Sequence, residues 1–261
     1  MRPLWTGSIS FGLINIPVRL FSGSHSNTLD LDMLRKDDLC PVRFARVCRS
    51  DGKEIPYEDI VKGYRYRPGD YVVLTDKDFE KADIKKTRTI DLLDFVKEAQ
   101  VDPLYYEKPY YLEPQKSGWK SYVLLREALR KSKRVGIARF VLRNREHIAV
   151  LKPYEDMIVL NQLRYQEELR PMDKFKIPHT ADVEPRELDM AMALVDELTT
   201  SFRPKAYRDT YVQDLKRIIE EKAKGREPHA RGKAPRPSNV KDLMSLLKSS
   251  LKQQQDRKRA A

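Results

Sequence analysis

The stretch WTGSISFGLINIPVRLF, from Trp5 to Phe21, decides the fold of this 261-residue chain. Its second half has apolar side chains at positions 14, 16, 18 and 20, the period of two that is typical of a strand with one buried face. The segment from Thr6 to Gly12 is also strand-like. Pro17 lies inside the second strand, which indicates an edge or a bulge because proline cannot donate a ladder hydrogen bond. The chain therefore begins with two predicted strands.

Short strands continue beyond this opening, separated by turns at 50–52 and 67–70. The further strands that we expect lie at 29–34, 42–47, 64–66, 71–74, 88–95, 110–112, 135–142, 148–151 and 157–163. So many short strands at close spacing predict a barrel or a sandwich. Arg143-Asn144-Arg145-Glu146 separates two of the strands, and we expect a hairpin whose tip presents both arginines.

Helical periods appear at two places. Behind Ser121, a predicted N-cap, apolar residues recur at helical spacing, and the outer face of that helix is basic, with Arg126, Arg130, Lys131 and Lys133. After Pro185 two amphipathic helices follow, ended by Pro204 and by Gly225. Their apolar stripes are Leu188, Ala191, Met192, Val195, Leu198 and Phe202 in the first and Tyr207, Tyr211, Leu215, Ile218 and Ile219 in the second. These stripes pack either on the chain's own strands or on a second subunit.

The last part of the sequence changes character again. Residues 225–239 combine prolines and glycines with basic residues, the composition of a flexible linker. A short apolar patch follows, formed by Val240, Leu243, Met244, Leu246, Leu247 and Leu251. Such a short segment is marginal as an isolated helix in water, so we expect it to become ordered on a partner. Residues 252–261 form a basic tail.

The net charge of +12 is concentrated in two segments. Residues 222–261 hold twelve Lys and Arg against three Asp and Glu, and residues 115–147 hold ten against two. This distribution favours a polyanionic partner, and nucleic acid before membrane, because neither segment has the large apolar face of an interfacial helix. A basic surface that is merely solvated remains the alternative. With no apolar run long enough to span a bilayer and no apolar signal region, we expect a cytoplasmic protein.

Motifs for catalysis do not appear in the sequence. Phosphate-binding loops, zinc-protease helices and nucleophile elbows are absent. Arg49-Ser50-Asp51-Gly52 is similar to the ligase Lys-x-Asp-Gly motif, but an arginine is a poor nucleophile, and a tight turn explains the sequence. Asp30-Leu31-Asp32 and Asp76-Lys77-Asp78 are weak candidates for a magnesium site, and the latter reads as the start of a helix. Cys40 and Cys48 are too few for a zinc site and are expected to be buried, reduced thiols, so we predict neither metal nor cofactor.

Four blocks in order resemble bacterial Ku proteins, the DNA-end-binding family of prokaryotic non-homologous end joining. They are Trp5–Val18 (WTGSISFGLINIPV), Tyr57–Tyr64 (YEDIVKGY), Tyr110–Pro114 (YYLEP) and Arg134–Phe140 (RVGIARF), and the resemblance extends from about residue 5 to 225. Asp242–Lys248 (DLMSLLK) is similar to the short C-terminal segment with which these proteins engage a ligase. Some members have a second cysteine pair near Cys48, where this chain has Asp51-Gly52, and this departure argues further against a metal.

The resemblance implies an α+β fold, in which a β-barrel core carries an inserted arm that encircles DNA and a helical C-terminal region follows. We divide the chain into 1–180 (barrel and arm), 181–225 (helices that support a dimer) and 226–261 (linker, ligase-docking segment and basic tail). The implied function is a homodimeric ring without enzymatic activity, associated with the nucleoid, that binds double-stranded DNA ends. It would recruit and stimulate the multifunctional ATP-dependent DNA ligase of the pathway. An architectural protein that coats DNA without needing an end is the alternative.

Site residues can also be named from the sequence. A ring that accepts any broken end must contact the sugar-phosphate backbone rather than base edges, which requires Arg and Lys. The predicted DNA-binding residues are Arg143 and Arg145, with Arg43, Arg46, Lys108 and Lys133 as companions. The predicted ligase-docking residues are Val240, Leu243, Met244, Leu247 and Leu251.

Overall fold

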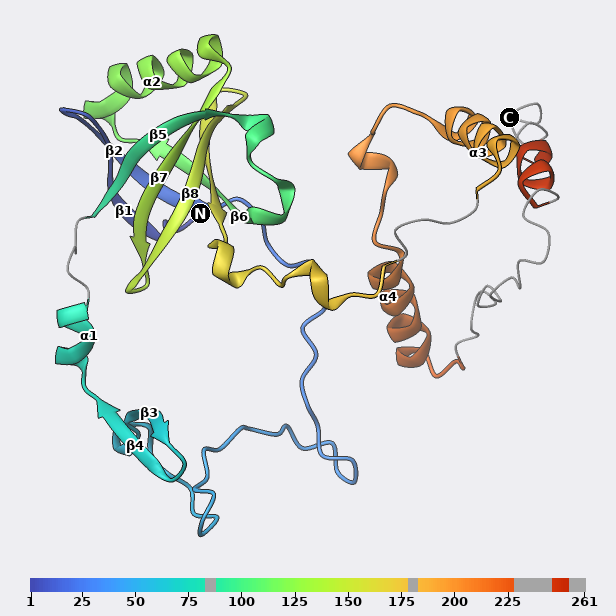
Figure 1. Ribbon diagram of the computed structural model, residues 1–261. Coiled ribbons are helices and arrows are strands. Elements are labelled where there is room, and N and C mark those ends of the chain that lie inside the picture. Colours follow the sequence, from blue (N-terminus) through green and yellow to red (C-terminus); the bar gives the residue numbers. More distant parts are fainter. Residues whose placement is uncertain (83–87, 178–182, 228–245, 254–261) are drawn as a thin grey trace. The chain divides into compact units, whose positions relative to one another are not determined.

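The computed structural model describes residues 1–82, 88–177, 183–227 and 246–253 (Figure 1). The chain divides into two compact units. One consists of Met1–Ser26 with Asp30–Pro171, and the other of Asn27–Leu29 with Met172–Ala261.

A closed β-barrel forms the centre of the first unit (Figure 1). Its strands follow one another around the barrel in the order β1-β2-β6-β9-β8-β7-β5. Neighbours pair antiparallel, except that β1 and β5 pair in parallel where the barrel closes. The strands are β1 (Trp5–Phe11), β2 (Ile14–Ser22), β5 (Thr89–Lys97), β6 (Tyr106–Pro114), β7 (Arg134–Leu142), β8 (Arg145–Tyr154) and β9 (Met157–Leu163). The predicted barrel is thereby confirmed, and the sandwich is excluded.

The alternation in the opening stretch explains how β2 packs. Ile16, Val18 and Leu20 are all buried in the core, as a period of two requires. Pro17 pairs with Ser8 of β1, whereas the ladder between β2 and β6 begins only at Val18. Proline therefore stands where β2 has a ladder on one side only, as its missing N–H predicts.

Helix α2 (Trp119–Ser132) closes one end of the barrel. The hydroxyl of Tyr122 donates a hydrogen bond to the Leu112 carbonyl and accepts one from the Ile158 amide, both 2.6 Å long. The prediction that Ser121 caps this helix is wrong, because the N-cap is Gly118. A Cβ at Gly118 would lie 2.7 Å from Cδ of Pro17, so glycine lets the helix start against β2.

A long insertion separates β2 from β5 in the chain and contains the hairpin of β3 (Lys62–Arg67) and β4 (Asp70–Leu74) and helix α1 (Asp76–Ala82). The strands predicted at 29–34 and 42–47 are wrong, since this region forms only the isolated bridges Leu34 to Pro41 and Val47 to Glu54. Within the described residues its apolar side chains have no second layer to pack on, and that of Phe44 is 86% exposed. Alternation without a partner surface does not make a strand.

The second unit contains the two predicted C-terminal helices, α3 (Pro185–Leu198) and α4 (Thr210–Ala223), and a third helix at 246–253. The part of the predicted stripe that lies in α3 faces solvent, with Met192 57% and Val195 64% exposed. Phe202 and Tyr207, which the prediction included in the two helical stripes, lie outside both helices. In α4 the stripe is mixed, because Tyr211 is exposed whereas Leu215 and Ile218 are half-buried. An apolar surface therefore remains uncovered in the described single chain.

Short 3-10 helices connect the longer elements. They are η1 (Tyr57–Asp59), η2 (Glu98–Gln100), η3 (Pro103–Tyr105), η4 (Lys116–Gly118), η5 (Gln166–Glu168), η6 (Met172–Lys174) and η7 (Pro204–Ala206). None of the helices in the described ranges has the length and apolar character needed to cross a bilayer.

Candidate nucleic-acid interface

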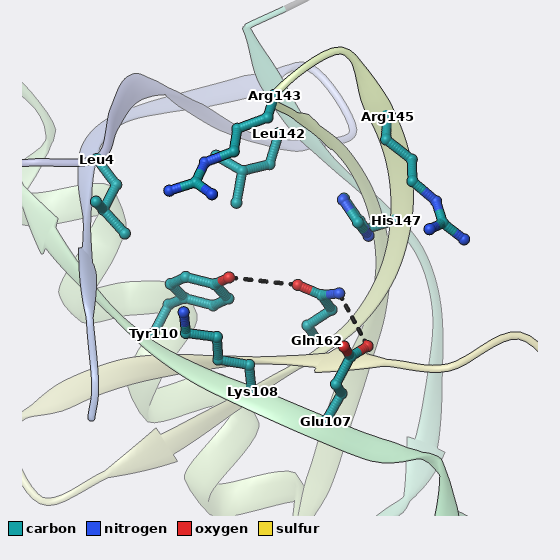
Figure 2. Close-up of a pocket in the computed structure, with 9 residues that line it drawn as sticks. All are labelled: Leu4, Glu107, Lys108, Tyr110, Leu142, Arg143, Arg145, His147 and Gln162. Carbon is teal, nitrogen blue, oxygen red and sulfur yellow. Dashed lines mark hydrogen bonds between the residues drawn. The ribbon is translucent and has the colours of Figure 1, made fainter. Parts of the chain in front are cut away.

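A pocket of about 360 Å³ opens at the turn between β7 and β8, and Figure 2 shows its lining. Because β7 begins directly after α2, this turn lies at the other end of the barrel from α2. The pocket lies there because the apolar interior of the barrel gives way to polar side chains in the last inward-facing positions of three strands. Lys108 continues the inward series of Tyr110 and Leu112 on β6. His147 and Gln162 do the same on β8 and β9. The lining residues are Leu4, Glu107, Lys108, Tyr110, Leu142, Arg143, Arg145, His147 and Gln162.

A β-bulge brings Glu107 to the same pocket as Lys108. In a regular strand these neighbours would point to opposite faces. The register between β6 and β9 shifts between Tyr106 and Lys108, so Glu107 is the extra residue of the bulged strand. A carboxylate and an ammonium group therefore both line one pocket.

The hairpin of β7 and β8 supplies the arginines. Leu142 pairs with Arg145, so the turn is only Arg143 and Asn144, with φ of 53° and 62°. Two positive φ angles define the type I′ turn that fits the twist of a hairpin, and side chains other than Gly adopt it at some cost. The expected hairpin is confirmed, but its tip presents Arg143 alone, since Arg145 already belongs to β8.

The two arginines differ in their surroundings. Figure 2 shows Arg143 reaching over the pocket toward Tyr110, whereas the guanidinium of Arg145 points away from it. Arg145 forms an ion pair with Glu168, with Nη2 2.6 Å from Oε1, and this contact helps to lower the pKa of Glu168 after a backbone hydrogen bond from Tyr165. Arg143 has no carboxylate partner within the described ranges.

Lys108 is the second cation of the pocket lining for which no carboxylate partner occurs among the described residues. Its Nζ lies 5.6 Å from the centre of the Tyr110 ring, a cation–π distance. Below it, the Tyr110 hydroxyl donates to Oε1 of Gln162 at 3.3 Å, and Nε2 of Gln162 donates to Glu107 at 3.0 Å. This network, buried at Tyr110 and Gln162, fixes the floor of the pocket, while the two cations stay available for an anion.

His147 stands between the arginines of the hairpin and packs on Phe140, with ring centres 5.5 Å apart. Burial lowers the pKa of His147, and the charge of Arg145 lowers it further. A backbone hydrogen bond to Leu142 and the carboxylates of Glu107 and Glu168 act in the opposite direction. The imidazole is therefore neutral near pH 7, and an anion placed in the pocket would favour its charged form.

The other predicted DNA-binding residues are not brought to this pocket. Lys133 follows α2 at the start of β7, ten residues and roughly 30 Å from Arg143 along that strand. Arg43 and Arg46 belong to the insertion. There Arg43 lies 3.5 Å from Glu54, and Arg46 lies over the Tyr57 ring at 5.0 Å. The structure therefore unites Lys108, Arg143 and Arg145 but separates them from the remaining three.

Two arginines of the basic helix are tied to the barrel rather than free. Nη1 of Arg126 donates to the Asp156 carbonyl at 2.6 Å, and Arg130 donates to the Glu155 carbonyl. Both also contact Glu127. The expected outward basic face is thus wrong for Arg126, whose side chain is only 16% exposed.

Sequence reasoning missed His147, Gln162 and Glu107. His147 follows Arg145 by two residues, so strand alternation places both on one face once β8 is recognised. For Glu107 no such signal exists, because the bulge that turns it inward appears only in the pairing register.

The cysteines are less buried than expected: Cys40 is exposed and Cys48 is half-buried, and both are free thiols. Arg49-Ser50-Asp51-Gly52 forms the expected tight turn, closed by a 2.9 Å hydrogen bond from the Gly52 amide to the Cys48 carbonyl. Across the described ranges, no three His, Cys, Asp or Glu side chains gather in a way that could hold a metal ion.

Of the predicted ligase-docking residues, Val240, Leu243 and Met244 lie outside the described residues. Leu247 and Leu251 lie in the helix at 246–253, one turn apart and half-buried.

The geometry defines a class of protein, a closed β-barrel with a cationic mouth and a long insertion between two of its strands. Residues 10–190 match the Ku70/Ku80 beta-barrel domain. The chain is also 43% identical over 256 residues to the non-homologous end joining protein Ku of Opitutus terrae, covering 97% of this chain and 92% of that protein. Proteins of the same name from Coxiella burnetii and Bacillus subtilis are 38% and 37% identical, covering 100% and 96% of this chain and 97% and 82% of their own lengths. The chain belongs to the bacterial Ku family of non-homologous end joining proteins.

Proposed function

We propose that this protein binds the ends of double-stranded DNA, without sequence specificity, in the repair of double-strand breaks. One observation carries the proposal: Arg143 and Lys108 converge without carboxylate partners at the mouth of the barrel. Cations held ready in this way attract phosphates, which every DNA sequence presents equally. The matched relatives are named for non-homologous end joining, and that process acts on DNA ends.

The proposal includes a homodimeric ring. The apolar stripe of α3 is solvent-exposed in the single chain, and a second copy of the chain would cover it. The insertion between β2 and β5 would serve as the arm that completes the ring. We accordingly retain the division into residues 1–180, 181–225 and 226–261.

We further propose that the protein has a DNA ligase as its partner and is not itself an enzyme. Residues 240–251 would dock the ATP-dependent DNA ligase of the pathway, and the basic tail would add nonspecific attraction to DNA. The protein itself would have no enzymatic activity, and it would act at the bacterial nucleoid.

Replacing Arg143 and Lys108 together by Ala is expected to lower the affinity for DNA. It is also expected to make that affinity less sensitive to salt concentration. Each lost phosphate contact should lower the slope of log affinity against log salt by about 0.9, or about 1.8 for the pair. Arg145→Ala should change the slope less, because its guanidinium is bound to Glu168. Fluorescence anisotropy with a short duplex over a range of salt concentrations measures the slope.

Arg139→Ala is the matched control for this test. Arg139 lies on the same hairpin and its Nε is 3.9 Å from a carboxylate oxygen of Glu146, outside the pocket. The Arg143 change should leave the fold intact, because Ala keeps the Cβ and hence the backbone preference of the turn. An unchanged slope in the double variant, with a normal far-ultraviolet spectrum, would remove the pocket from the DNA interface.

A further inference from the structure

The mouth pocket is closed at its base. Tyr110 and Gln162 form the floor and are only 4% and 8% exposed. Beneath them the barrel interior is apolar, and α2 seals its far end through the Tyr122 hydroxyl. A ligand must therefore enter and leave by the same opening. A duplex can lie across such a pocket, and a single projecting group such as a phosphate can enter it.

The polar groups of the pocket select for a small anion. Arg143 and Lys108 carry two positive charges and form no ion pair within the described chain, and Figure 2 shows both side chains directed toward the Tyr110 ring. The single carboxylate of the lining, that of Glu107, accepts a hydrogen bond from Gln162 and offsets one of the three positive charges that Lys108, Arg143 and Arg145 bring to the lining. Two cations with separate directions of approach suit the several acceptor oxygens of a phosphate group.

The volume agrees with this choice. About 360 Å³ is many times the roughly 30 Å³ that one water molecule occupies in the liquid. A phosphate group, the carbon that it esterifies and some bridging water all fit.

We propose that the mouth pocket is a discrete site for a single phosphate group, whose oxygens are held by Lys108 and Arg143, with His147 as a third donor in its charged form. The inference deepens the proposed function and rests on it, because the same residues are assigned to the DNA interface. The new element is that the contact with phosphate is a defined pocket that holds one phosphate group at a time. The phosphate belongs either to the bound DNA or to a free phosphorylated compound.

His147 reports on occupancy. The groups that face it are Arg143 and Arg145 on its own hairpin, Glu107, Lys108 and Tyr110 on β6, and Glu168 of η5. A phosphate dianion beside the ring favours imidazolium, so binding must raise the pKa of His147, and protonation must equally strengthen binding. The second pKa of a phosphate ester lies near 6. Below about pH 6 protonation of His147 strengthens binding, but the phosphate loses one of its two negative charges, which weakens it.

Inorganic phosphate titrated into the full-length, histidine-labelled protein tests the site by nuclear magnetic resonance. The His147 signal, assigned with His147→Gln, should shift saturably and titrate at a higher pH when phosphate is bound. The exposed His25 should not respond. Arg143→Ala and Lys108→Ala should each weaken phosphate binding by about tenfold or more, whereas Arg139→Ala should not.

A second arm identifies the source of the phosphate. Displacement of inorganic phosphate by a linear duplex with 5′-phosphate ends, but not by the same duplex with 5′-hydroxyl ends, supports the site and assigns it to a terminal phosphate. Equal displacement by both supports it and assigns it to an internal phosphate. DNA binding without displacement supports it as a site for a free phosphorylated compound.

A His147 signal that does not respond to phosphate, or that saturates equally in the Arg143→Ala variant, overturns the inference. If such a protein still binds DNA ends, the proposed function stands. Conversely, a saturable phosphate response in a protein that binds no DNA overturns the proposed function and leaves the site.

Discussion

The proposed dimer is expected to dissociate into monomers when Met192 and Val195 are both replaced by Asp. Both side chains belong to the exposed apolar stripe of α3, so the isolated chain should tolerate the change. In a dimer each carboxylate would be buried against apolar surface, at an effective penalty of several kcal/mol. Dimer affinity should fall about a thousandfold or more. Sedimentation velocity measures the mass, and the variant should no longer retain linear DNA.

Ala193→Asp is the control for this double variant, because Ala193 is exposed on the same helix but lies about a third of a turn away from the stripe. Leu215→Asp and Ile218→Asp on α4 should also give monomers. Their side chains are half-buried within the single chain, so each needs a check of helical content. A folded dimer of normal affinity in the Met192 and Val195 variant contradicts the assignment of α3 to the interface.

Leu243→Ala combined with Leu247→Ala is expected to abolish stimulation of the partner ligase while leaving DNA binding unchanged. Leu247 lies with Leu251 on one side of the helix at 246–253, and apolar side chains spaced one turn apart are the usual anchors when a helix docks into an apolar groove. Ligation of a linear duplex by the purified ligase, with and without this protein, measures the effect.

Truncation of residues 252–261 should have the opposite effect, lowering DNA affinity while keeping Leu247 and Leu251, although it removes the last two described residues of the helix at 246–253. The matched control for the double leucine variant is Lys248→Ala with Ser250→Ala, since both residues are exposed on the helix at 246–253. Ligase stimulation at the full level in the double leucine variant would move the docking site to another surface of the chain, with the barrel as the better candidate.

Alternation was enough to predict most of the barrel from the sequence. The strand expected at 157–163 has the bounds of β9, and the hairpin around Arg143 was recognised from the apolar runs on its two sides. Alternation failed at 29–34 and 42–47 because it indicates a strand only where a second layer covers one face. No layer covers these segments in the described chain, and a single sequence does not show which strands lack such cover.

Only part of the candidate site was predictable, because single residues can be recognised from the sequence whereas the pairing of distant strands cannot. Arg143 and Lys108 were named separately, but their meeting depends on β6 and β8 both flanking β9, which no local pattern reveals. Lys133 was grouped with Arg143 because they are near in sequence, yet an extended strand places them at opposite ends of the barrel. Polar residues at inward positions, such as Gln162, look like solvent-facing residues until the register is known.

Binding to one DNA sequence in two forms, as a linear fragment and as a nick-free, covalently closed circle, tests the central claim most directly. A ring that threads onto a free end must bind the linear form and fail to load on the circle. We expect a clear preference for the linear form at a fixed salt concentration, because only a free end lets a ring load, whereas the nonspecific attraction of the basic segments acts on both forms. Equal affinity for the two forms would contradict end binding and would favour an architectural protein that coats DNA.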